Sequence, residues 1–128
     1  MTISILGAGA FGTALAISLA RSSKDVILWT HDQGHAEAMQ STRQNTRRLK
    51  GITLPDSIIP TADLGLATRT GTILLAVPAQ ALAEFAQSAA EHLDGKPLVA
   101  CCKGIDLASG RGPAEILRNS CPNSPSQC

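Results

Sequence analysis

The chain has 128 residues, of which 44% are hydrophobic and 16% charged, and its formal net charge is +1 at pH 7. This length suits one domain with a substantial core, and the near-neutral charge gives no reason to expect nucleic acid or a membrane surface as a partner. Aromatic residues make up only 2% of the chain, which leaves little for stacking on single-stranded nucleic acid. No apolar run approaches a membrane span, and no basic segment typical of a signal peptide opens the chain. We therefore expect a cytoplasmic protein.

The cysteines give no sign of a metal site or of disulfides. They stand at Cys101, Cys102, Cys121 and Cys128. This spacing matches no zinc pattern, and the adjacent pair lies in an apolar run typical of a buried strand.

The first stretch of the chain has the order of a dinucleotide-binding unit. Residues 2–6 are predicted as a buried strand, residues 7–12 read Gly-Ala-Gly-Ala-Phe-Gly, and residues 13–21 are helix formers. Strand, G-x-G-x-x-G and helix follow one another as this unit requires. A merely structural glycine-rich turn is the alternative.

Each glycine of this turn has a separate physical role. Gly7 allows the tight turn, Gly9 lets the backbone approach a pyrophosphate, and Gly12 lets the helix pack closely on the strand. The backbone N–H groups and the dipole at the helix start favour phosphate.

The rest of the chain alternates strands with helices. A second strand over 26–29 closes a β-α-β unit of about 30 residues, and its continuous apolar character is typical of a parallel strand covered on both faces. Next along the chain, we predict a helix over 34–43, a basic stretch over 43–50 that leads into a loop, and an edge strand over 58–61. A short helix within 63–69 and a strand over 72–77 follow, and then an amphipathic helix whose one face carries Leu82, Phe85, Ala86, Ala89 and Leu93. The last predicted elements are a strand over 98–102 and a helical piece over 113–118.

This alternation predicts an α/β fold, a Rossmann-type doubly wound parallel sheet that is truncated after about five strands. The expected organisation is a dinucleotide-binding domain over 1–120 and an irregular tail over 121–128. Ligands of such sheets bind beyond the carboxyl ends of the strands, near the switch point of the strand order.

The end of the second strand is the predicted site of the adenosine ribose. Asp32 lies 20 positions past Gly12. A carboxylate there binds a ribose 2′-hydroxyl and repels a 2′-phosphate, whereas a cation does the reverse. His31 could bind that phosphate together with a basic residue from the following run, which offers Arg43, Arg47, Arg48 and Lys50; the same run could equally be a solvated loop. The choice between NAD and NADP therefore stays open.

Two further strand ends carry candidate site residues. Pro78 fixes the exit of the chain after Val77 and removes a donor, so that the turn can pack against the nicotinamide-side ribose; a plain strand stop is the alternative. Lys103 follows the fifth strand and could donate to a substrate carbonyl or phosphate, while Gly104 permits a close backbone approach. From spacing alone, a surface lysine is the simpler interpretation of Lys103.

Together these stretches resemble the N-terminal domain of bacterial-type NAD(P)-dependent glycerol-3-phosphate dehydrogenase. The matching segments occur in family order over nearly the whole chain, at 7–16, 28–31, 45–55, 77–80 and 102–106. The resemblance implies reversible reduction of dihydroxyacetone phosphate to sn-glycerol 3-phosphate with NAD(P)H, which feeds phospholipid synthesis.

The resemblance also assigns roles to individual residues. Ala10 and Phe11 would contact the pyrophosphate side of the cofactor, His31 its adenosine end, and Lys103 both substrate and nicotinamide, where an ammonium helps to polarise the ketone. The family pattern Asn-x-x-Tyr-Leu-Pro appears here with Arg48 in place of the tyrosine and lysine in place of the proline, so this cofactor-binding loop departs from the family.

The family continues past this chain into a sixth strand, a substrate loop and a helical domain with a second catalytic lysine. We therefore expect a cofactor-binding fragment with negligible turnover by itself. An unpaired edge on the fifth strand predicts either weak stability or self-association, the latter giving a homo-oligomer. The alternatives are a ketopantoate reductase-like dehydrogenase, which Lys103 fits poorly, and a non-catalytic dinucleotide-sensing or interaction module.

Overall fold

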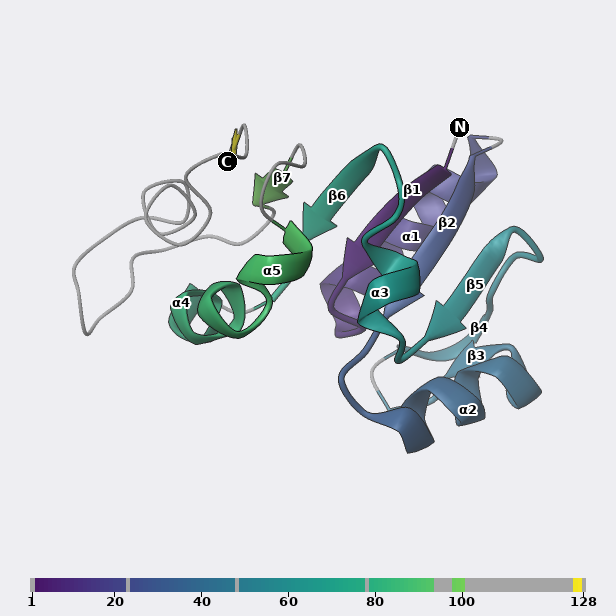
Figure 1. Cartoon of the computed structure of the whole chain (residues 1–128). Helices are drawn as coiled ribbons and strands as arrows, with labels where there is room; N and C mark the ends of the chain where they lie inside the picture. Colours follow the sequence, from purple (N-terminus) through teal and green to yellow (C-terminus); the bar gives the residue numbers. More distant parts are fainter. Residues whose placement is uncertain are drawn as a thin grey trace.

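The computed structural model describes residues 2–22, 24–47, 49–77, 79–93, 98–100 and 126–127. Within these ranges, six strands form a parallel sheet in the order β5-β2-β1-β6-β7-β8 (Figure 1). The strands are β1 (Thr2–Leu6), β2 (Asp25–Trp29), β5 (Ile58–Thr61), β6 (Thr72–Leu75), β7 (Leu98–Ala100) and β8 (Ser126–Gln127). The order runs outward from β1 in both directions, which confirms the predicted Rossmann-type doubly wound sheet.

Helices cover the two faces of this sheet. The helices are α1 (Ala10–Arg21), α2 (Gln33–Thr42), α3 (Leu64–Ala67), α4 (Ala79–Ser88) and α5 (Ala90–Leu93). Figure 1 shows α2 beside β5, and α4 and α5 near β6 and β7. No helix in the described part of the chain has the length and apolar character needed to cross a membrane.

The second strand is apolar from Val26 to Trp29 because both of its faces are buried there. In β2, Val26 and Leu28 pack with α1, whereas Ile27 and Trp29 pack on the opposite face with residues of α3, α4 and α5. Successive strand side chains point to opposite faces, so burial on both sides removes the polar alternation of a half-exposed strand.

The carboxyl ends of the central strands lie level with one another. Leu6 of β1 is in register with Trp29 of β2 and Leu75 of β6. Two backbone bonds continue the ladder past the strand ends: Gly7 N–H donates to Trp29 O at 2.9 Å, and Ala76 N–H donates to Leu6 O at 2.9 Å. The turns after β1, β2 and β6 therefore open at one edge of the sheet, as the sequence predicts.

The structure differs from the sequence predictions between the second helix and the third sheet strand. The sequence predicts a basic loop there, but Gln44–Asn45 (β3) and Leu49–Thr53 (β4) form a two-stranded antiparallel hairpin. Gly51 lies inside β4 with a φ of +79° and so does not end the element. A two-residue strand is too short to show the two-residue alternation of a strand, so hydrophobic periodicity does not predict it.

The end of the chain also differs. The sequence predicts an irregular tail over 121–128 and an open edge on the fifth strand. Instead, Ser126 and Gln127 pair in parallel with Leu98 and Val99 of β7. The edge of β7 is therefore paired at these two positions, where the sequence predicts an open edge. Prolines and polar residues hide such a short strand, because its pairing depends on the neighbouring strand rather than on its own composition.

Candidate functional site

In the turn between β1 and α1, two of the three motif glycines are packed tightly against backbone and the third faces open space. Gly7 has a φ of +124°, and a Cβ there would lie 2.7 Å from Ala76 O. A Cβ on Gly12 would overlap the carbonyl oxygen of Gly7. A Cβ on Gly9, by contrast, would meet no atom within 4 Å. The turn therefore packs tightly against the end of β6 and the start of α1, and it leaves space in front of Gly9.

Helix α1 begins inside the motif, earlier than the predicted start at residue 13. Gly9 is its N-cap in an extended conformation, with φ −77° and ψ −173°, and no side chain caps the helix. Uncapped N–H groups and the positive end of the helix dipole make such a start a ready anion site. Ala10 is exposed and Phe11 is 59% exposed, so the first two residues of α1 are accessible to a ligand.

The predicted site residues on the far side of the turn are described only in part. Val77 is half-buried and packs against the apolar cluster under β6. Arg48, Pro78, Lys103 and Gly104 lie outside the described residues, as do all four cysteines and the helical piece predicted over 113–118. Among the described residues, no group of three or more His, Cys, Asp or Glu could hold a metal ion.

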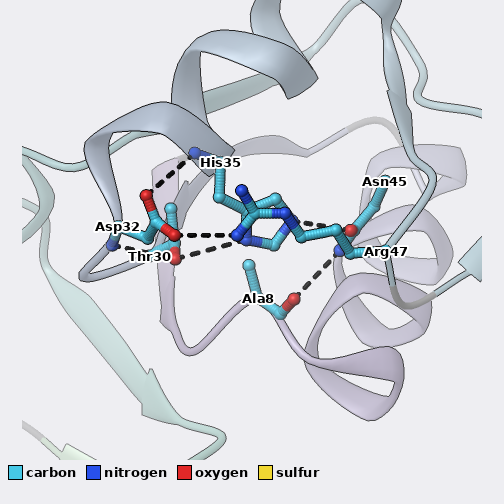
Figure 2. A network of polar contacts seen from close by, with 6 residues as sticks. All are labelled: Ala8, Thr30, Asp32, His35, Asn45 and Arg47. Carbon is cyan, nitrogen blue, oxygen red and sulfur yellow. Dashed lines mark hydrogen bonds and ion pairs between the residues drawn. The ribbon is translucent and has the colours of Figure 1, made fainter.

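A buried polar network joins the glycine turn to α2 and the hairpin (Figure 2). Asn45 is 0% exposed, and its amide nitrogen donates to Ala8 O at 2.9 Å and to Thr13 Oγ1 at 2.7 Å. Its amide oxygen lies 2.7 Å from Nε2 of His35, which is also buried. The Nδ1 atom of His35 lies 3.5 Å from Thr30 Oγ1.

The partners of this network fix its proton positions. A backbone carbonyl can only accept, so the amide nitrogen of Asn45 must face Ala8 O and its oxygen must face His35. His35 therefore carries a proton on Nε2 and donates it to Asn45. Ala8 lies between Gly7 and Gly9, and its carbonyl oxygen thus accepts a hydrogen bond from the Asn45 side chain of the hairpin.

The end of β2 carries an ion pair at the predicted ribose position. Asp32 is the N-cap of α2: its Oδ1 accepts from His35 N–H at 3.2 Å, and its Oδ2 accepts from Arg47 Nη1 at 2.7 Å. The side chains of Arg47 and Asp32 are 54% and 41% exposed. The hydrogen bond from Arg47, followed by that from the His35 backbone, lowers the pKa of Asp32 below its ordinary value of 3.8. The carboxylate is therefore ionised at neutral pH.

The basic residues proposed for a 2′-phosphate do not all reach this place. Arg43 is the left-handed C-cap of α2, with φ 56°, and its Nη2 donates to Pro55 O at 2.7 Å and Ile58 O at 2.9 Å. Arg43 thus ties α2 to the edge strand, and its Nη2 is used there rather than beside Asp32. Arg47 is brought to Asp32, and His31 is exposed at the end of β2. The side chain of Lys50 is not among those described.

Sequence reasoning missed the residues of the buried network as functional candidates. His35 lies in no motif, Thr13 and Thr30 lie in matching family segments without an assigned role, and Asn45 is only the first residue of the family pattern. The contacts of Asn45 join residues 32 and 37 positions apart in the chain. No local spacing reports contacts of that range.

Comparison with known proteins gives a consistent result over almost the whole chain. The family model described as NAD-dependent glycerol-3-phosphate dehydrogenase N-terminus matches residues 2–128. The chain is 50% identical over 124 residues to a glycerol-3-phosphate dehydrogenase [NAD(P)+] of Ruegeria sp. (strain TM1040), and the match covers 97% of this chain and 38% of that relative. The corresponding protein of Cereibacter sphaeroides is 48% identical over 123 residues, covering 96% of this chain and 35% of the relative. The chain thus spans less than two fifths of these relatives.

Solved structures agree with this result. A crystal structure of glycerol-3-phosphate dehydrogenase from Coxiella burnetii superposes with a TM-score of 0.89 at 31% identity, covering 98% of this chain and 39% of that chain. A ketopantoate reductase from Ralstonia eutropha JMP134 gives 0.74 at 22% identity, covering 98% of this chain and 40% of that chain. At that identity the likeness shows a shared fold alone. The family model, the relatives and the Coxiella structure together show that this chain belongs to the NAD-dependent glycerol-3-phosphate dehydrogenase family, as its N-terminal part.

Proposed function

We propose that this chain binds NAD(P)H and forms the cofactor half of an active site that reduces dihydroxyacetone phosphate to sn-glycerol 3-phosphate. The glycine turn carries the proposal. Its first and third glycines are closed by backbone, while Gly9 faces open space beside an uncapped helix start. A pyrophosphate fits these conditions, because it needs close backbone approach and N–H donors that no protein group occupies.

The cofactor would lie along the carboxyl edge of the sheet, across the strand order's switch point. Gly7, Gly9 and Gly12 shape the turn that receives the pyrophosphate, and Ala10 and Phe11 contact it from the start of α1. The adenosine end would lie toward His31 and the hairpin, where family likeness adds Arg48. The nicotinamide end would lie toward Val77 and Pro78.

Family membership supports the reduction step of this proposal. Lys103 would donate to the ketone oxygen of dihydroxyacetone phosphate and balance the charge of the substrate phosphate. The product would serve phospholipid synthesis in the cytoplasm. Because the chain spans 38% of the Ruegeria relative, most substrate contacts are expected from the part of such relatives that these 128 residues do not match.

Cofactor binding can be measured with the single tryptophan of the chain. Trp29 is buried at the end of β2, with its ring centroid 5.4 Å from that of Phe85. Titration with NADH should quench its emission in a saturable way by energy transfer to the nicotinamide. A folded chain that shows no saturable change would overturn the proposal.

A substitution at Gly9 tests whether the cofactor lies against this turn. Gly9→Ala is compatible with the observed φ of −77° and adds a methyl group where the protein has no atom within 4 Å. We expect the melting temperature to change little, and NADH affinity to fall about tenfold or more, because the methyl group takes pyrophosphate space. Unchanged affinity would place the cofactor elsewhere.

Turnover separates the cofactor half from a complete site. The 128-residue chain mixed with NADH and dihydroxyacetone phosphate should not consume NADH at a measurable rate. Steady consumption that Lys103→Ala abolishes would contradict this expectation and would mean that these residues suffice for catalysis.

A further inference from the structure

The ion pair between Asp32 and Arg47 stands where a Rossmann site distinguishes its two cofactors. Asp32 follows β2 directly and uses both carboxylate oxygens, one on the start of α2 and the other on Arg47 at 2.7 Å. A carboxylate at this position ordinarily accepts from a ribose 2′-hydroxyl and repels a 2′-phosphate. Here a guanidinium compensates its charge.

The hairpin delivers Arg47 to this place. Asn45, two residues earlier, is fully buried and bound to Ala8 O, Thr13 and His35. The turn end of the hairpin, where Asn45 pairs with Leu49, is therefore fixed to the same glycine turn that would hold the pyrophosphate. Figure 2 shows Arg47 reaching from the hairpin side toward the carboxylate of Asp32. The backbone that carries Arg47 is thereby anchored next to the glycine turn.

The guanidinium of Arg47 also has N–H donors available for a ligand. A guanidinium has five N–H donors, and Asp32 is its one partner among the described residues, through Nη1. The side chain is 54% exposed. Arg43 lacks this capacity at the site, because its Nη2 is committed to two carbonyls beside the edge strand.

Resting on the proposed function, we propose that Arg47 is the residue of this site that binds a 2′-phosphate, and that Asp32, which holds Arg47, binds the ribose hydroxyls when that phosphate is absent. With NAD, Asp32 accepts from the ribose hydroxyls while it still holds Arg47. With NADP, the 2′-phosphate takes the guanidinium in a bidentate, charge-assisted contact, and Asp32 remains the N-cap of α2. Arg47 is thus the residue that determines whether a 2′-phosphate is tolerated.

The test compares NADH with NADPH on the 128-residue chain and two variants. Arg47→Ala should lower NADPH affinity about ten- to a hundredfold, the range of a lost hydrogen bond to a charged group, and should change NADH affinity by less than about threefold. Asp32→Asn keeps an N-cap acceptor and removes the negative charge. It should raise NADPH affinity relative to NADH.

Controls separate this inference from the proposed function. Arg69→Ala removes an exposed charge of the same sign ahead of β6, and should leave the ratio of the two affinities unchanged. Competition by 2′,5′-ADP against 5′-AMP isolates the adenosine end, and Arg47→Ala should abolish the preference for 2′,5′-ADP. If the wild-type chain binds neither NADH nor NADPH, the proposed function falls. If it binds both and Arg47→Ala weakens both equally, or neither, only the role of Arg47 is overturned.

Discussion

Different interactions hold the helices and loops against the two faces of the sheet. On the face of α1 and α2, an apolar cluster is joined by a polar network that runs from Ala8 through Asn45 and His35 to Thr30. On the face of α3, α4 and α5, an apolar cluster includes the tilted Trp29–Phe85 ring pair, and Thr70 Oγ1 donates to the buried Ser4 Oγ at 2.9 Å. Within the described residues, Trp29 Nε1 is the single buried side-chain nitrogen or oxygen without a hydrogen-bond partner.

This difference separates stability from positioning. Apolar burial is non-directional and roughly proportional to area, so it stabilises the fold without fixing one loop against another. Hydrogen bonds are directional, and a buried network is costly when one member is missing. The buried hydrogen-bond network lies on the face that holds the glycine turn and the hairpin. A cofactor bound to that turn would need the protein groups around it to be fixed in position.

The largest effect on stability is expected from the apolar face. Leu75 is 0% exposed at the end of β6. Leu75→Ala should lower the free energy of unfolding by about 2–5 kcal/mol, through lost burial and a residual cavity. Urea unfolding measures this, and NADH affinity of the folded fraction should stay near the wild-type value. Leu66→Ala, at a side chain that is 36% exposed, is the control and should cost well under half as much.

Breaking the polar network should cost less stability and more binding. Asn45→Ala leaves Ala8 O, Thr13 and His35 without their shared partner, and we expect a loss of about 2 kcal/mol. NADH affinity should fall in addition, because the carbonyl of Ala8 is released. Exposed Thr46 supplies the control as Thr46→Ala. A stable variant with unchanged affinity would show that the network does not position the turn.

Replacing the same amide by a carboxylate sharpens the comparison. Asn45→Asp keeps the size but cannot donate to Ala8 O while it is ionised. Its folded state should favour the protonated acid, which raises the pKa of the new carboxyl. The stability deficit relative to wild type should therefore shrink as the pH falls toward the range in which the acid protonates. A deficit that is independent of pH would contradict the assigned donor.

The smallest effect concerns the exposed ion pair. The pKa of Asp32 is lowered, first by the hydrogen bond from Arg47, so ionised Asp32 favours the folded state. Its contribution should be complete above the ordinary value of 3.8 and should be lost as the pH falls through the lower value of the folded chain. Comparing urea midpoints of wild type and Asp32→Asn from pH 7 to pH 3 measures it. A difference that grows on acidification would have the wrong sign.

Much of the fold could be predicted because its signals are local. The predicted strand over 2–6 matches β1, and the predicted edge strand over 58–61 matches β5, with Pro60 in register with Leu28. The amphipathic face of α4 and α5 is also confirmed where it is described, since Ala86, Ala89 and Leu93 are buried. Periods of 2 and 3.6 residues and the turn preference of glycine are properties of a few neighbouring residues.

The candidate site divides along the same line. The sequence by itself determined the glycine turn, the helix behind it and the common edge at which the strands end, because backbone sterics and apolar periodicity act over short distances. Only the tertiary structure decided which cation does what: Arg43 ties α2 to the edge strand, whereas Arg47 meets Asp32. It also decided the burial of Asn45 beneath the turn and the pairing of Ser126–Gln127 with β7. These outcomes depend on partners far along the chain, and charge or composition at one position does not specify such partners.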